Sequence, residues 1–213
     1  MGRFDLAYDA TGPPKLLEYN GDTPSVLVES GAVQYNWYRY IAKSNPNYKN
    51  SVRQANFIER AMSAGFGKMV EDGRIDTLNG LGFVSVEGDV EMKGTVNYIQ
   101  QIAKRSFIKT FGCDIKDFSI TQSKKGSKAI PCLKKKPFKA IFKMYPYEWL
   151  VNEMSNQNLM EYDHLLAEDL KDIDTIEPAW KLILGNKAIL PLLWEMFPGH
   201  PNLLAAYFID PQV

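Results

Sequence analysis

The stretch GRFDLAYDATGPPKLLEYNGDTPS, from Gly2 to Ser25, combines two alternating segments with a run of turn residues. In a strand over residues 3–8, Arg3, Asp5 and Ala7 would point to one face and Phe4, Leu6 and Tyr8 to the other. In a strand over residues 16–20, Leu16, Glu18 and Asn20 would share a face opposed to Leu17 and Tyr19. Between them lies Asp9-Ala-Thr-Gly-Pro-Pro, a composition that is typical of a turn. The stretch therefore predicts a β-hairpin near the start of this chain of 213 residues.

The polar residues of this hairpin predict a metal and phosphate site. If Asp5 lies across from Glu18 and Arg3 across from Asn20, all four side chains project from one face, and a slip of one residue would break this arrangement. Two carboxylates and an amide carbonyl are oxygen donors of the kind that Mg²⁺ accepts. Arg3 would hold an anion beside the metal. The alternative interpretation is a surface hairpin with solvated charges.

The end of the stretch has the composition of a helix start. Thr23 is expected to cap a helix, Pro24 to take its first position, and an apolar run begins at Val26. Because a helix start collects free amide groups, it is expected to bind a carboxylate or phosphate with the hydroxyls of Thr23 and Ser25.

A helix with an aromatic face is predicted from Val26 to about Ala42. Val33, Trp37 and Tyr40 recur near helical spacing. Packing in the core is the favoured interpretation, and stacking of an aromatic ring on a substrate is the alternative.

The middle of the chain predicts an α/β architecture. Leu81 to Val86 has the composition of a strand and Glu91 to Phe107 that of a helix, which makes a βα step. Carboxylates at Glu87, Asp89 and Glu91 most simply meet the positive end of the helix dipole, and one of them could instead face the amine of a substrate. Further expected elements are a helix over 54–71, a strand over 138–144, a helix from 146 toward 154, and an acidic helix or loop over 163–172.

The chain turns basic between Thr121 and Lys136. A solvated loop is the favoured interpretation of this lysine cluster, which comprises Lys124, Lys125, Lys128, Lys134, Lys135 and Lys136. Phosphate or RNA binding is the alternative, but no aromatic residues are interleaved with the lysines. If the substrate is a polycation, these lysines should lie away from it because like charges repel.

Composition favours an ordinary soluble protein. The 25 basic and 25 acidic side chains balance, which argues against a protein built for nucleic acid or for an anionic membrane surface. No apolar run approaches the ~20 residues of a membrane span, and the start does not resemble a signal peptide, so a cytoplasmic location is expected. No oligomeric state is indicated.

The two cysteines, Cys113 and Cys132, are expected to be free thiols. They are too few for a disulfide framework and lack the spacing of a zinc site. A catalytic role for Cys113 is disfavoured because neither His164 nor His200 is close to it in sequence.

Two sets of motifs resemble the ATP-grasp synthetase part of the glutathionylspermidine synthase family. They are GRFD with LLEYN-x-DTPS, and IEPAWKLILGNKAILPLLWEMFPGHPNLL from Ile176 to Leu204; the resemblance is looser from about Asn45 to Lys136. It implies an α/β (α+β) ATP-grasp-like fold and a single synthetase-like domain over 1–213. It also implies an ATP- and Mg-dependent carboxylate-amine ligase, which activates a glutathione-like peptide acid as an acyl phosphate for attack by a polyamine-like amine.

The resemblance also implies roles by position. They are metal ligands at Asp5, Glu18 and Asn20, an acyl-phosphate contact at Arg3, peptide-substrate contacts at Thr23 and Ser25, and a nucleotide contact at Lys187. Asn186 is expected to cap the turn before Lys187.

The chain also departs from the family pattern. Family members have a segment before the arginine, and they continue into a Lys-Pro strand, a Gly-rich loop over the phosphates and a late arginine. We therefore expect a fragment or a shortened homologue that lacks the later nucleotide-lid segments. The alternative function is a non-catalytic homologue that retains only a peptide or acid pocket.

Overall fold

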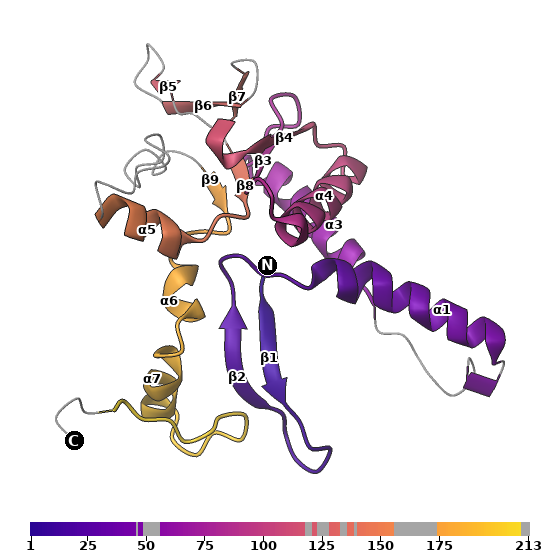
Figure 1. Cartoon of the computed structure of the whole chain (residues 1–213), viewed down its shortest axis with the longest axis vertical. Helices are drawn as coiled ribbons and strands as arrows, with labels where there is room; N and C mark the ends of the chain where they lie inside the picture. The colour runs from indigo at the N-terminus through magenta and orange to yellow at the C-terminus, as the bar shows by residue number, and fades with distance from the viewer. Residues whose placement is uncertain are drawn as a thin grey trace. The chain divides into compact units, whose positions relative to one another are not determined.

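The computed structural model describes most of the chain as two compact units (Figure 1). The described residues are 1–45, 47–48, 56–117, 121–122, 128–132, 136–138, 140–155 and 174–209. The first unit comprises Met1–Pro24, Pro146–Trp149 and Glu177–Val213, and the second comprises Ser25–Tyr145 and Leu150–Ile176. A single domain over 1–213 stays a prediction.

The first unit contains the predicted hairpin. Strands β1 (Arg3–Ala7) and β2 (Lys15–Asn20) run antiparallel (Figure 1). The turn between them is held by Asp9, whose Oδ1 accepts a hydrogen bond from the amide of Thr11 at 2.9 Å. Asp favours such a turn because its side chain can accept a hydrogen bond from the backbone two residues on. The turn thus follows from local chemistry.

The two end motifs of the chain meet in this unit. Helices α6 (Lys181–Gly185) and α7 (Ile189–Met196) follow each other, and α6 contacts β2. The segment after α7 bonds to the hairpin: the amide of Leu16 donates to Asn202 O at 2.8 Å, and Asn202 Nδ2 donates to Pro14 O at 2.8 Å. Residues from opposite ends of the sequence therefore form one unit.

The second unit is built on a parallel sheet of four strands, which confirms an α/β architecture. The sheet order is β4-β3-β8-β9, with every neighbouring pair parallel. The strands are β3 (Leu81–Ser85), β4 (Thr110–Asp114), β8 (Ala140–Lys143) and β9 (Asp174–Ile176). Phe83 and Phe142 are fully buried on neighbouring strands, with ring centroids 5.5 Å apart. Strands β3 and β8 are buried along almost their whole length. Such buried strands are typical of a parallel sheet that is covered by helices.

Helix α4 (Val90–Arg105) packs on strands β3 and β4, and α3 (Ile58–Glu71) packs on α4. Asp89 caps α4 because its Oδ1 accepts a hydrogen bond from the amide of Met92 at 2.8 Å. Ile99, Ile102 and Ala103 are buried on the inner side of α4, as the helical periodicity predicts. The predicted βα step from the strand at Leu81 is thereby confirmed.

The remaining described elements are two short helical turns, two α-helices and a separate sheet of three strands. They are the π-helical turn η1 (Glu29–Val33), α1 (Gln34–Ser44), the 3₁₀ turn η2 (Ile115–Asp117), α5 (Tyr147–Ser155), and the sheet β5 (Thr121–Gln122), β6 (Lys128–Cys132) and β7 (Lys136–Phe138). No helix in the described part has both the length and the apolar character needed to cross a membrane.

The aromatic helix expected from Val26 begins one residue later, whereas the expected cap at Thr23 and first helical position at Pro24 are wrong. Val26 has φ +65°, which a right-handed helix cannot accommodate, and helical geometry begins at residue 27. Thr23 and Pro24 therefore precede the helix rather than cap and open it. Core packing of the aromatic face is also wrong, because α1 has no buried residue and Tyr40 is 70% exposed.

Two expectations about the middle of the chain also need correction. The basic stretch is not a plain loop, because Lys128 and Lys136 begin strands β6 and β7, although Lys124, Lys125, Lys134 and Lys135 lie outside the described residues. Cys113 is disulfide-bonded rather than a free thiol. The side chain of Cys132 and the acidic stretch 163–172 lie outside the described part.

Candidate functional site

The hairpin pairs in the register that the sequence predicts. Arg3 is the partner of Asn20, and Asp5 is the partner of Glu18. Directly opposed residues of an antiparallel pair project from the same face, so these four polar side chains share one face of the hairpin.

The register shifts immediately after Asp5. Leu6 pairs with Leu16, which leaves Leu17 as the extra residue of a bulge beside the Asp5–Glu18 pair. Bulges increase the local twist of a strand, re-aim side chains, and occur often beside functional sites. The bulge thus marks the point where the polar face ends.

The guanidinium of Arg3 donates two hydrogen bonds to the carboxylate of Asp5. Arg3 Nε lies 2.8 Å from Asp5 Oδ1, and a terminal guanidinium nitrogen lies 3.2 Å from Oδ2. The hydrogen bond from Arg3 lowers the pKa of Asp5 below its ordinary value, and the positive charges of Arg3 and Lys187 contribute in the same direction. Asp5 is therefore an ionised acceptor at neutral pH.

Lys187 reaches the same face from the turn between α6 and α7. Its Nζ lies 3.3 Å from Glu18 Oε2. The turn is held by Asn186, whose Oδ1 accepts a hydrogen bond from the amide of Ala188 at 2.9 Å, which confirms the expected cap. The structure thus brings together Lys187 and the four predicted hairpin residues.

Asn20 has unused hydrogen-bonding capacity. Its Nδ2 atom is buried and has no partner within the described part of the chain. Because an unmade hydrogen bond in a buried group costs about 1–3 kcal/mol, such atoms often mark a place for a ligand. Because Nδ2 is a hydrogen-bond donor, it is suited to an oxygen of a ligand beside the two carboxylates, whereas only Oδ1 of the same amide could face a cation.

The donor set fits a hard divalent cation that keeps some of its water. Asp5, Glu18 and Asn20 offer carboxylate and amide oxygens, the donors that Mg²⁺ accepts together with water and substrate phosphates. They do not make a closed protein cage: no group of three or more His, Cys, Asp or Glu side chains suited to a metal occurs among the described residues. The fit is thus to a metal shared with phosphate oxygens.

The expected substrate residues Thr23 and Ser25 are both half-buried, with Thr23 in the first unit and Ser25 opening the second. Beside them, Asp22 Oδ2 accepts a hydrogen bond from the amide of Tyr147 at 2.7 Å, which ties this segment to the start of α5. The prediction that Thr23 and Ser25 lie at a helix start is wrong, because the helix begins only at residue 27, after Val26.

Sequence reasoning missed a buried ion pair between two residues of the motif that runs from Ile176 to Leu204. Glu177 and Lys181 are 3% and 7% exposed, and Lys181 Nζ donates a hydrogen bond to Glu177 Oε2. Burial is the largest single effect and lowers the pKa of Lys181, but the hydrogen bond to Glu177, a hydrogen bond with the chain's N-terminus and the negative charge of Glu177 together raise this pKa above its ordinary value. The available signal was the i,i+4 spacing of two opposite charges in an apolar motif.

The parallel sheet of the second unit contributes a second candidate location. The chain leaves β3 toward β4 and leaves β8 toward β9, so the strand order reverses between β3 and β8. Ligands of open parallel sheets bind outside the carboxyl ends of the strands at such a switch point. Lys143 ends β8, is 3% exposed, and donates a hydrogen bond to Tyr145 O at 2.9 Å. Sequence reasoning had not singled out this lysine, which was visible only as a charge within an apolar strand.

Comparisons with known proteins agree with the predicted resemblance. A family model described as Glutathionylspermidine synthase preATP-grasp matches residues 1–213. The chain is 32% identical over 215 residues to a protein of Haemophilus influenzae named "Putative acid--amine ligase", covering 97% of this chain and 48% of that protein. It is 28% identical over 221 residues to a trypanothione synthetase of Crithidia fasciculata, covering 97% and 32%. It is 24% identical over 225 residues to a glutathionylspermidine synthase of the same organism, covering 98% and 30%. The chain thus spans about half or less of the length of these relatives.

Proposed function

Because the chain belongs to the glutathionylspermidine synthase preATP-grasp family, we propose that it takes part in an ATP- and Mg-dependent acid–amine ligase reaction. The observation that carries the proposal is the shared face of the hairpin, where Asp5 and Glu18 are paired and Lys187 lies 3.3 Å from Glu18. Two carboxylates beside two cations are suited to a metal and to phosphate oxygens at the same place.

The proposed reaction has two steps. The carboxylate of a peptide acid attacks the γ-phosphorus of ATP, which forms an acyl phosphate and releases ADP. The nitrogen of an amine then attacks the acyl carbon, which forms the amide, releases phosphate and gives up a proton. Mg²⁺ would supply neutralisation of phosphate charge.

The side chains of the hairpin have distinct roles in this proposal. Asp5, Glu18 and Asn20 hold the metal, Arg3 stabilises negative charge on the acyl phosphate, and Lys187 binds the nucleotide. In the structure Arg3 and Lys187 instead pair with Asp5 and Glu18. Arriving phosphates offer both cations a new anionic partner, which would release the carboxylates for the metal.

The substrate class comes from the names of the relatives. The relatives include a glutathionylspermidine synthase and a trypanothione synthetase, and these names support a glutathione-like peptide acid and a polyamine-like amine. Thr23 and Ser25 would contact the peptide acid. An ATP-grasp architecture for the whole protein, with one domain over 1–213, is part of the same proposal.

The test is ATP turnover in the presence of glutathione and spermidine, with the amide product measured by mass spectrometry. Asp5→Asn and Glu18→Gln are expected to abolish both signals. Asp72→Asn is the matched control, because Asp72 is an exposed carboxylate that pairs with Lys68 on α3. If ATP turnover is the same in all three variants, the assignment of the metal ligands is wrong. Binding of glutathione without any turnover would favour the non-catalytic alternative.

A further inference from the structure

A short segment of the second unit has an unusual backbone immediately after Ser25. Val26 has φ +65°, a region that β-branched residues rarely occupy. The helix that follows contains the π-helical turn η1, in which the amide of Gln34 bonds to Glu29 O, five residues back. Strained residues and π-helical turns both concentrate at functional sites. Two independent departures from ordinary geometry thus lie within nine residues, Ser25 to Val33.

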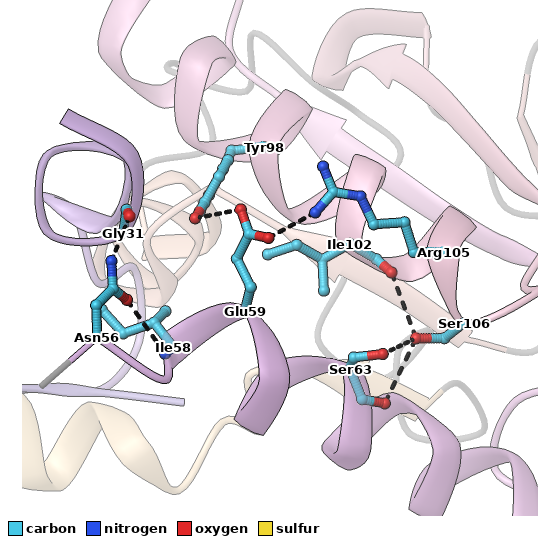
Figure 2. Close-up of polar contacts among 9 residues, drawn as sticks. All are labelled: Gly31, Asn56, Ile58, Glu59, Ser63, Tyr98, Ile102, Arg105 and Ser106. Carbon is cyan, nitrogen blue, oxygen red and sulfur yellow. Dashed lines mark hydrogen bonds and ion pairs between the residues drawn. The ribbon is translucent and has the colours of Figure 1, made fainter. Parts of the chain in front are cut away.

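The π-helical turn is held from outside at Gly31. Asn56 Nδ2 donates a hydrogen bond to Gly31 O at 2.5 Å (Figure 2). Gly31 is buried, and a Cβ added there would meet the hydroxyl oxygen of Tyr98 at 2.3 Å and its ring carbon Cζ at 3.0 Å. The ring of Tyr98 therefore fits against the turn only because residue 31 has no side chain.

Tyr98 is itself fixed by a chain of polar contacts between α3 and α4. Its hydroxyl donates a hydrogen bond to Glu59 Oε1 at 3.0 Å, and the other oxygen of Glu59 lies 2.5 Å from a guanidinium nitrogen of Arg105 (Figure 2). One turn further along, the hydroxyls of Ser63 and Ser106 lie 2.7 Å apart. The helix pair thus provides a rigid support for the turn.

We infer that Tyr98 and Asn56 are positioning residues, which hold the π-helical turn so that Ser25 is presented to the acid substrate. This inference rests on the proposed function, in which Ser25 contacts the peptide acid. Neither Tyr98 nor Asn56 touches the substrate in this account. They act through Gly31 and the backbone that leads back to Ser25, so displacing the turn would remove the hydrogen bond of Ser25 to the substrate.

The test uses isothermal titration of the 213-residue chain with glutathione as the probe. Gly31→Ala is expected to weaken affinity about tenfold or more, because its Cβ would displace the turn from Tyr98. Gly94→Ala on α4 is the matched control, since a Cβ there meets nothing within 4 Å, and it is expected to bind as the unaltered chain does. The double variant Gly31→Ala/Tyr98→Phe lacks the Tyr98 hydroxyl oxygen, which is the atom nearest to the added Cβ. Its affinity for glutathione should therefore be higher than that of Gly31→Ala alone.

Hydrogen exchange without any ligand supplies the second readout. Gly31→Ala and Asn56→Ala should speed exchange of the amides of 27–34 while the amides of the parallel sheet stay protected. If Gly31 and Asn56 only stabilised the fold, these variants would lower the unfolding temperature, but the folded protein would keep its affinity for glutathione. Unchanged affinity in Gly31→Ala, or unchanged exchange in both variants, would overturn the inference. If the unaltered chain binds no glutathione, the proposed function fails, and the exchange data alone decide whether the turn is held as described.

Discussion

Lys187 Nζ lies 3.3 Å from Glu18 Oε2, so the turn between α6 and α7 is tied to strand β2 by an ion pair. Together with the bidentate contact of Arg3 to Asp5, this pair gives both carboxylates of the polar face, Asp5 and Glu18, a cationic partner. Both cations are suited to bind phosphate when a nucleotide arrives.

Removing the amino group of Lys187 should weaken nucleotide binding and leave stability nearly unchanged. The side chain is 74% exposed, so Lys187→Ala should lower the free energy of unfolding by less than about 1 kcal/mol. Loss of a charged contact to phosphate should reduce affinity for a non-hydrolysable ATP analogue about tenfold or more. The control is Lys68→Ala, which removes a similarly exposed lysine from its pair with Asp72. Equal affinities of the two variants would contradict the role of Lys187.

The pKa of Asp5 should depend on Arg3. The hydrogen bond from Arg3 holds this pKa below its ordinary value of 3.8, so Arg3→Met should raise it toward that value. Because the folded-state pKa is lowered, the stabilisation is present above pH 3.8 and is lost as pH falls through the folded-state pKa. Carboxyl ¹³C NMR measures the change directly.

Asp9 is the internal control for that titration. Its pKa is also lowered, but mainly by the hydrogen bond from the backbone of Thr11. It should therefore titrate identically before and after Arg3→Met. A parallel rise at Asp9, or no rise at Asp5, would show that Arg3 does not act on Asp5 specifically.

Tyr98 should ionise at a higher pH than an ordinary tyrosine does. Burial, followed by the hydrogen bond to Glu59 and its negative charge, raises the pKa of Tyr98 from 10.0 to about 12. Because the folded-state pKa is raised, the stabilisation is complete below pH 10 and is lost as pH rises toward 12. Ring ¹³C NMR should show one tyrosine titrating near pH 12, and Tyr98→Phe should remove that signal. Retention of the signal in Tyr98→Phe would assign it to another residue.

The parallel sheet should depend on the Phe83–Phe142 contact. Phe83 is fully buried, so Phe83→Ala should lower the free energy of unfolding by about 3–5 kcal/mol through lost burial and the cavity left behind. Phe57→Ala removes an aromatic ring that is 61% exposed and should cost no more than about 0.5 kcal/mol. Urea unfolding compares the two, and similar losses would argue against this core.

The hairpin and the βα step could be predicted from the sequence because short-range rules decide them. Alternation sets which residues share a face, and the confirmed register joins Asp5 to Glu18. Likewise, the apolar run at Leu81 and the periodicity of Ile99 and Ile102 indicate a buried strand and its covering helix. These signals lie within single elements.

The features that were missed depend on contacts between elements. The aromatic spacing of Tyr40 is that of a buried face, yet no described element covers it. The positive φ of Val26 contradicts the preference of a β-branched residue, so no local rule predicts it. Tyr98 acquires its role only because α3 brings Glu59 to it and Gly31 leaves room. Spacing in the sequence contains none of this information.

Isothermal titration of the chain with Mg-ADP, repeated without Mg²⁺ and with Asp5→Asn, tests most directly whether the hairpin binds a metal and a nucleotide. Binding should require Mg²⁺ and should fall about tenfold or more in Asp5→Asn, because Asp5 would hold the metal beside the phosphates. Circular dichroism shows whether each sample is folded. Binding that is independent of both Mg²⁺ and Asp5, or no binding by the folded chain, would contradict the claim that the hairpin forms a nucleotide and metal site.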